Sequence, residues 1–76
     1  MNNYGVVLFY TSSSAMQAEA VLLRAKLAAR LIPTPRELSS DCGVALRFDW
    51  DQSEVVQSLL NKSRVEIAGI QSLPGK

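Results

Sequence analysis

Short apolar stretches of strand type alternate along the chain with two longer stretches of helical type. Residues 5–10 form an apolar run rich in β-branched and aromatic residues, which predicts a strand in the middle of a sheet. Residues 30–32 predict a second short strand. It belongs at a sheet edge, because Pro33 and Pro35 follow it and cannot donate hydrogen bonds to a neighbour. Residues 44–48 alternate between apolar and other positions and predict a third strand with one buried face.

The segment between the first two strands has the pattern of an amphipathic helix. Ser14 is followed three residues later by Gln17, which is the spacing of a capping box and predicts a helix start at Ser14. The helix is expected to end near Lys26. Its apolar side is predicted from positions i, i+4, i+7 and i+11, which are Met16, Ala20, Leu23 and Leu27.

A second helix is predicted from Asp51 to Lys62, with Asp51 and Glu54 forming a box at its N-terminus. Trp50, just before this helix, is expected to be a partly exposed residue that packs against its neighbours or an interface contact. The apolar side of the helix is predicted to consist of Val55, Val56, Leu59 and Leu60.

The last strand is predicted around Val65 and Ile67, and a β-bulge is expected at Gly69 because Ile70 is out of phase with both. The order strand, helix, strand, strand, helix, strand predicts a ferredoxin-like α+β fold. It consists of a four-stranded antiparallel sheet with both helices on one face. Right-handed crossovers give the spatial strand order 4-1-3-2. At this length, residues 1–76 are expected to form one domain with a thin core.

Composition narrows the classes of function. The chain has eight basic and seven acidic residues, a net charge of +1 and no basic run with interleaved aromatics, so nucleic-acid binding is not expected. One cysteine and no histidine exclude an internal disulfide, a zinc finger or iron–sulfur cluster held by this chain alone and every histidine-dependent triad. No cofactor is expected. The N-terminal sequence has no signal-peptide pattern and no apolar run spans a bilayer, so we expect a cytoplasmic protein that does not enter the membrane.

The single cysteine, Cys42, is the candidate reactive residue and lies in a loop that leads into the third strand. A reactive thiol needs a population of thiolate, access to a partner and a backbone that holds it in place. Arg36 is a candidate counter-charge for the thiolate, and Gly43 allows a tight turn or the close approach of a partner. Pro33 and Pro35 are expected to stiffen the loop.

The predicted topology brings distant parts of the chain to the same sheet edge as this loop. The end of the first strand, the start of the first helix, the end of the second strand and the start of the third strand meet there. The end of the second helix reaches the same side. The residues expected along this edge are Ser12, Ser13, Ser14, Arg36, Cys42, Lys62 and Arg64.

The three serines are interpreted mainly as helix caps, with binding of an anion or a persulfide as the less favoured role. Basic groups and a helix N-terminus near Cys42 would lower the pKa of its thiol, whereas Glu37 and Asp41 would raise it. Sequence alone leaves the balance between these effects open.

Residues 31–48, LIPTPRELSSDCGVALRF, resemble the signature of small bacterial proteins of the Se/S carrier protein-like family. Its core consists of two prolines and an arginine, followed by Ser39, Ser40, one further residue, Cys42 and Gly43. The likeness covers nearly the whole chain, since the opening strand, the serine-rich turn and residues 18–19 also match. In one departure, Lys26 and Leu27 stand where similar proteins often have a glycine at the end of the first helix.

The resemblance implies a cytoplasmic carrier, or a sulfurtransferase-like protein, rather than a conventional enzyme. Cys42 would hold sulfur or selenium as a persulfide or selenopersulfide. The donor would be a cysteine desulfurase or selenocysteine lyase, and the acceptor an unknown protein. One thiol is enough for such a relay, because each transfer is an attack of one nucleophile on the outer sulfur.

Two alternatives remain open at this point. The first is a non-catalytic ferredoxin-like module for regulation or protein interaction, possible as a homodimer through its sheet, in which Cys42 is a structural residue. The second is a metallochaperone-like domain, which is disfavoured because one cysteine without histidine supplies too few ligands unless two chains share the metal.

Overall fold

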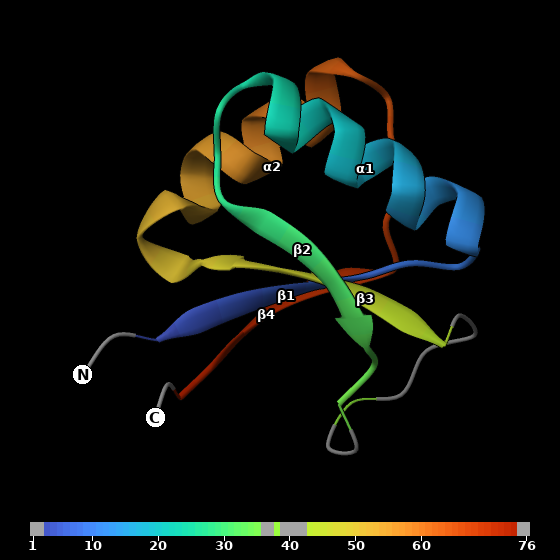
Figure 1. Cartoon of the computed structure of the whole chain (residues 1–76), viewed down its shortest axis with the longest axis vertical. Coiled ribbons are helices and arrows are strands. Elements are labelled where there is room, and N and C mark those ends of the chain that lie inside the picture. The colour runs from blue at the N-terminus through green and yellow to red at the C-terminus, as the bar shows by residue number, and fades with distance from the viewer. Residues whose placement is uncertain (1–2, 36–37, 39–42, 75–76) are drawn as a thin grey trace.

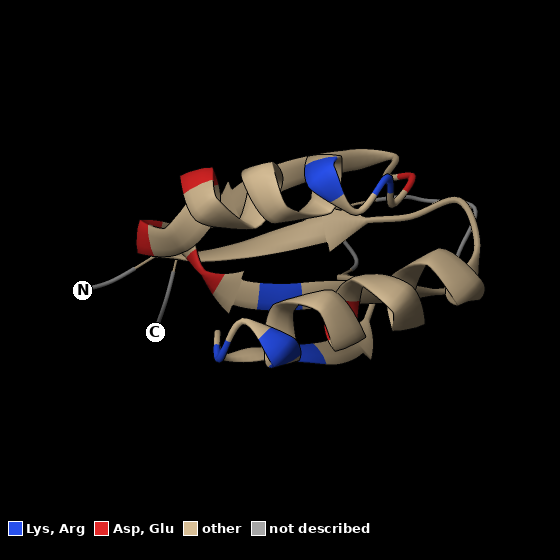
Figure 2. Cartoon of the chain, turned by 90° about the horizontal axis from the view of Figure 1, so that it is seen from above, with Lys and Arg blue, Asp and Glu red and all other residues tan. Residues whose placement is uncertain are grey.

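The computed structural model describes residues 3–35, 38 and 43–74 of the chain. Its strands β1 (Tyr4–Leu8), β2 (Ala29–Pro33), β3 (Val44–Asp49) and β4 (Gly69–Leu73) form one antiparallel sheet in the order β2-β3-β1-β4. Helices α1 (Ser12–Arg24) and α2 (Ser53–Lys62) cover the same face of this sheet (Figure 1) and run in opposite directions across it (Figure 2). The predicted ferredoxin-like fold and the spatial order 4-1-3-2 are confirmed.

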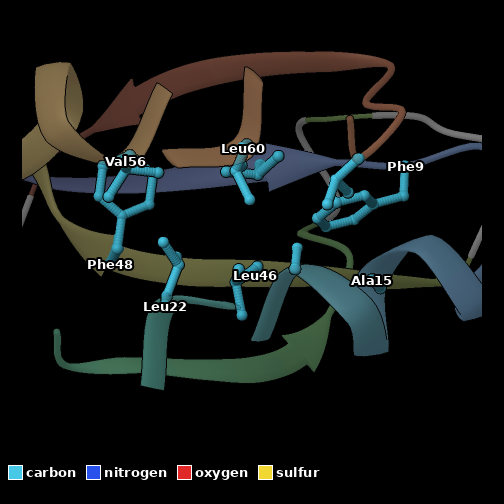
Figure 3. Packing of buried hydrophobic residues seen from close by; sticks show 10 residues of the cluster. Phe9, Ala15, Leu22, Leu46, Phe48, Val56 and Leu60 are labelled. Atoms are coloured by element: carbon cyan, nitrogen blue, oxygen red, sulfur yellow. The ribbon is translucent and has the colours of Figure 1, made fainter. Parts of the chain in front are cut away.

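The strand register divides the side chains between two faces of the sheet. Val7, Leu46 and Phe48 face the helices and belong to the main core. Val6 and Ala45, at alternate positions, point the other way and form a second, smaller cluster with Leu73. Figure 3 shows how the helices close the main core; its labelled residues are Phe9, Ala15, Leu22, Leu46, Phe48, Val56 and Leu60.

The buried side of α1 differs from the predicted one. Ala15, Ala18 and Leu22, spaced i, i+3 and i+7, are fully buried, whereas Met16 is 61% and Leu23 52% exposed. Helix α1 carries apolar residues on several sides, so the sequence contains two competing stripes. The stripe with two alanines faces the sheet, because small side chains let the helix backbone approach it closely. Of the predicted residues Met16, Ala20, Leu23 and Leu27, only Leu27 is partly buried against the core.

Both helix starts also differ from the prediction. Helix α1 begins at Ser12, and Thr11 is its N-cap, with the Thr11 Oγ1 accepting a hydrogen bond of 3.2 Å from the Ser14 backbone N–H. Helix α2 begins at Ser53 after a 3₁₀ turn, Trp50–Gln52, and no side chain caps it. The capping box predicted from Asp51 and Glu54 is therefore wrong, because Asp51 lies inside the 3₁₀ turn and not at the start of the helix.

In the described part of the chain, neither helix is long and apolar enough to cross a membrane.

Both helices end in a Schellman motif built on a basic residue. In α1, the Leu27 N–H donates to the Leu22 carbonyl and the Lys26 N–H to the Leu23 carbonyl, each at 3.0 Å. Lys26 has a φ of 63°, in the left-handed region that favours glycine. Arg64 occupies the same position after α2, with a φ of 57°. The chain thus keeps the turn at which similar proteins were expected to place glycine, with a lysine in the left-handed conformation.

The last strand begins later than predicted. Val65 follows α2 as a buried residue of its terminal turn, where its N–H donates to the Leu60 carbonyl at 3.0 Å, and β4 starts only at Gly69. Gly69 pairs in regular register with Leu8, so the predicted bulge is wrong.

Trp50 is half-buried and its ring centroid lies 6.0 Å from that of Phe48, as expected of a partly exposed packing residue.

Candidate functional site

The elements that the topology was expected to unite meet at one end of the sheet, which we call the loop edge. It consists of the last residues of β1 and β2, the first residues of β3 and β4, and the first turn of α1 (Figure 1). Leu8 lies opposite both Ala45 and Gly69, and Pro33 lies opposite Val44. Residues 63–68 lead from α2 into β4 at this edge, and the Ala68 N–H donates to the Leu8 carbonyl at 2.6 Å. The predicted meeting of these elements is confirmed.

The loop between β2 and β3 is closed at its base by the backbone. The Thr34 N–H donates to the Gly43 carbonyl at 3.1 Å, which continues the pairing one step beyond Pro33 and Val44. Strand β2 lies at the edge of the sheet, as predicted, but it extends one residue further than predicted and includes Pro33. Pairing does not stop at Pro33, however, because the next residue is not a proline and has a backbone N–H to donate.

The loop is also held at its middle. The Leu38 N–H donates to the Pro35 carbonyl at 3.0 Å, which fixes the Leu38 backbone to Pro35. The Leu38 side chain is half-buried and packs against the cluster on the face of the sheet that the helices leave uncovered, whose buried members are Val6, Ala45 and Leu73. Sequence reasoning missed Leu38, although an apolar residue within a polar loop was a signal for such an anchor.

Four of the predicted site residues, Arg36, Ser39, Ser40 and Cys42, lie outside the described residues. Their roles stay predictions. Gly43, which directly follows Cys42 in the sequence, is exposed, and its carbonyl accepts the bond that closes the loop. Among the described residues, none lies within 4 Å of where a Cβ atom at Gly43 would stand. Crowding by the described part of the chain therefore does not require glycine at this position.

The serines at the start of α1 are not its caps. Thr11 fills that role, and its hydroxyl also donates to the Ser14 Oγ at 3.2 Å. Ser12 and Ser13 lie exposed in the first turn, ahead of the first backbone bond of the helix, in which the Ala15 N–H donates to the Thr11 carbonyl at 3.3 Å. The signal for Thr11 was present in the sequence, since threonine three residues before Ser14 is an ordinary N-cap pattern.

The described charges near the loop edge are mostly positive. Helix α1 directs its N-terminus, the positive end of its dipole, toward this edge. Lys62, at the end of α2, and Arg64, in the connection to β4, are exposed on the same side, together with one acidic residue, Glu66. An anionic group at the loop edge would therefore meet more positive than negative charge from the described residues. Within the described part of the chain, no three side chains of the types that bind metals gather into a group.

The fold is that of a ferredoxin-like α+β domain, and the only cysteine of the sequence falls between its strands β2 and β3. A family model described as "Putative Se/S carrier protein-like" matches residues 4–72, which is nearly the whole chain. The chain therefore belongs to the Se/S carrier protein-like family. No curated protein and no solved structure matches the chain.

Proposed function

We propose that this protein carries sulfur or selenium on Cys42, as a persulfide or a selenopersulfide, between a donor enzyme and an acceptor protein. The observation that carries the proposal is the family match, since its range, residues 4–72, includes the loop with the only cysteine of the chain. Family membership supports a carrier of these elements. The persulfide, the donor and the acceptor are our inference from the chemistry of a single thiol.

The architecture of the loop supports this role. A carrier thiol must reach into the active sites of other proteins, so it belongs on a projecting segment and not in a core. The described parts of the connection between β2 and β3 are held by the Thr34–Gly43 bond at its base and by the Leu38 side chain. A tethered loop loses less conformational entropy when a partner binds it than a free loop does. Gly43, the next residue after Cys42 in the sequence, is exposed and has open space around it among the described residues, which leaves room for a partner.

The transfer steps balance without an oxidant, a metal or a cofactor. In loading, the Cys42 thiolate attacks the outer sulfur of a persulfide on the donor enzyme. A new S–S bond forms on Cys42, the S–S bond of the donor breaks, and the donor cysteine leaves as a thiolate. In unloading, a nucleophile of the acceptor attacks the outer sulfur of Cys42, and Cys42 leaves as the thiolate. Positive charge at the loop edge stabilises the thiolate both as the attacking and as the leaving group.

A cysteine desulfurase or a selenocysteine lyase is the donor that this chemistry requires, because these enzymes generate the outer atom that the carrier accepts. A reducing compartment such as the cytoplasm suits the carrier, since it keeps an unloaded thiol from being oxidised. Arg36 is proposed to stabilise the Cys42 thiolate, and Ser39 and Ser40 to contribute polar groups to the same loop.

The proposal is tested by loading the reduced protein with a cysteine desulfurase and cysteine and measuring its intact mass. We expect a gain of one sulfur atom that a thiol reductant removes. The Cys42→Ser variant is the matched control and should gain nothing, since the chain has no other cysteine. Replacing the desulfurase with a selenocysteine lyase and selenocysteine tests the selenium form.

Absence of the adduct with both donors would reject the carrier and favour the non-catalytic interaction module. In that case, the Cys42→Ser variant would retain the full activity of the protein in cells. An adduct of the same size on Cys42→Ser would also reject the proposal, because the sulfur would then lie elsewhere.

A further inference from the structure

The face of the sheet away from the helices, which we call the open face, is apolar at its centre (Figure 1). Strands of an antiparallel sheet with one open face usually alternate between apolar and polar residues. Central strand β1 departs from this pattern, because Tyr4, Val6 and Leu8 all lie on the open face, while Val7 faces the helices. Val6 and Ala45 are fully buried there, although no described helix or strand lies over them. The centre of the open face thus has the composition of a contact surface.

The side chains around this centre keep part of their surface open. Tyr4, Leu8 and Ile32 pack against the buried centre and are themselves only half-buried. Leu38 packs in the same cluster and is also half-buried. It comes from the connection between β2 and β3, which in the sequence also contains Cys42. A protein seated on the open face therefore touches, at Leu38, the connection that carries the thiol.

The open face also carries more positive than negative charge. Arg30 of β2 and Arg47 of β3 are register partners, so both side chains leave the sheet on this face, and both are exposed. The Arg47 Cζ lies 4.1 Å from the centroid of the Tyr4 ring, so Arg47 leans toward β1 and the two arginines present separate charges. Asp49 is the only acidic residue of the four strands. Within the described part of the chain, neither arginine forms an ion pair.

This charge distinguishes between two kinds of occupant. Two copies of the chain packed through their open faces would bring together twice as many arginines as aspartates, and like charges repel each other. A different protein that presents carboxylates around an apolar patch would pair with the arginines instead. An apolar centre with a polar rim is the usual anatomy of such an interface. The open face therefore fits an acidic partner better than a second copy.

We propose that the open face is the docking surface for the donor enzyme, and that the donor presents an apolar patch with carboxylates around it. The residues that receive the donor are Tyr4, Leu8, Ile32, Leu38, Arg30 and Arg47. The inference rests on the carrier function proposed for Cys42, because it assigns the surface through which that thiol meets its donor. Docking against Leu38 brings the donor to the connection that holds the thiol.

The charged part of the surface is tested by the rate of loading by a cysteine desulfurase at limiting concentrations of the carrier. Arg30→Glu places a carboxylate opposite Arg47, and an opposite-charge pair across two strands preserves the fold. We expect this variant to load about fivefold more slowly or worse at low ionic strength, with a smaller difference at high salt. Arg24→Glu reverses an exposed charge on α1 and is the matched control, with a change of less than about twofold.

The apolar part is tested by Ile32→Thr in the same assay. Threonine keeps the branched side chain that suits an edge strand but loses apolar contact, so loading should slow about threefold or more. Val55→Thr makes the same kind of change at an exposed position of α2 and should leave the rate unchanged.

A small-molecule donor separates docking from the carrier function, because cysteine persulfide can reach the thiol without a protein surface. All four variants should load from it within about twofold of the wild-type rate. Desulfurase rates equal to wild type for both Arg30→Glu and Ile32→Thr would overturn the docking surface and leave the carrier function standing. Absence of loading from both donors would instead reject the carrier function, and this inference with it. Concentration-dependent amide shifts on the open face of the protein alone would also overturn the proposal, since a second copy would then occupy it.

Discussion

Gly5 is the position at which the smallest possible change should have a large effect on stability. It is buried in the central strand β1, directly opposite Phe48 of β3, and the Phe48 ring lies over it. A Cβ atom at Gly5 would lie 2.6 and 2.7 Å from the Phe48 Cε1 and Cε2, and closer still to Cζ. The φ of Gly5 is not positive, so the reason for glycine here is space and not backbone conformation.

Gly5→Ala forces the Phe48 ring out of its place. The ring cannot turn into solvent, because Phe48 is only 2% exposed and belongs to the main core with Leu22 and Val56. Overpacking of this kind costs about 1–3 kcal/mol. A domain of this size has a free energy of unfolding of only about 4–11 kcal/mol, so the loss is a large fraction of it. The melting temperature should fall by about 4–8 °C for each kcal/mol lost.

The assay is urea unfolding of Gly5→Ala, Phe48→Leu and the double variant, followed by far-ultraviolet circular dichroism, because Trp50 lies too near Phe48 for its fluorescence to be a neutral probe. Phe48→Leu alone should cost about 1–2 kcal/mol through the cavity that it leaves. In the double variant, the methyl group introduced at position 5 fills part of that cavity. The double variant should therefore be more stable than the sum of the single losses predicts, by about 1 kcal/mol or more. A Gly5→Ala loss below about 0.5 kcal/mol, or strictly additive losses, would refute this reasoning.

Three further predictions concern the loop and the helix ends. Leu38→Ala should cost about 1–2 kcal/mol, less than a fully buried leucine, and speed the hydrogen exchange of the residue 38 amide; unchanged exchange would mean that the side chain does not hold the loop. Lys26→Gly should stabilise the protein by about 1 kcal/mol in thermal unfolding, while Lys26→Ala, which keeps a Cβ atom in the left-handed conformation, should not. Thr11→Ala should cost about 1 kcal/mol and Thr11→Ser much less, and equal losses would show that the hydroxyl is not the cap.

Much of the fold could be predicted because its signals are local. The period of two in residues 44–48, the apolar run that opens the chain and the prolines after residue 32 each depend on neighbouring residues. Element order then leads to the sheet order, since few topologies connect these elements with right-handed crossovers. The side of α1 that is buried could not be found in this way. Two apolar stripes compete there, and only contact with the sheet favours Ala15, Ala18 and Leu22 over Met16 and Leu23.

The features of the candidate site also fall into two groups, those that the sequence reveals and those that only the structure reveals. The cysteine, the prolines and the glycine of the loop are visible in the sequence, and so is the family that they indicate. The anchoring of Leu38 on the uncovered face of the sheet is not visible, because it joins a loop residue to strands far away in the chain. The pairing of Arg30 with Arg47 is hidden for the same reason.

The sequence by itself determined the number, type and order of the elements and the single thiol on which a carrier can work. Tertiary structure alone decided which helix face is buried, where β4 begins, how Leu38 is anchored and which residues are neighbours across the strands. The physical reason is that hydrophobic period and turn chemistry act over a few residues, whereas strand register and close contact of faces are set between segments that are distant in the chain.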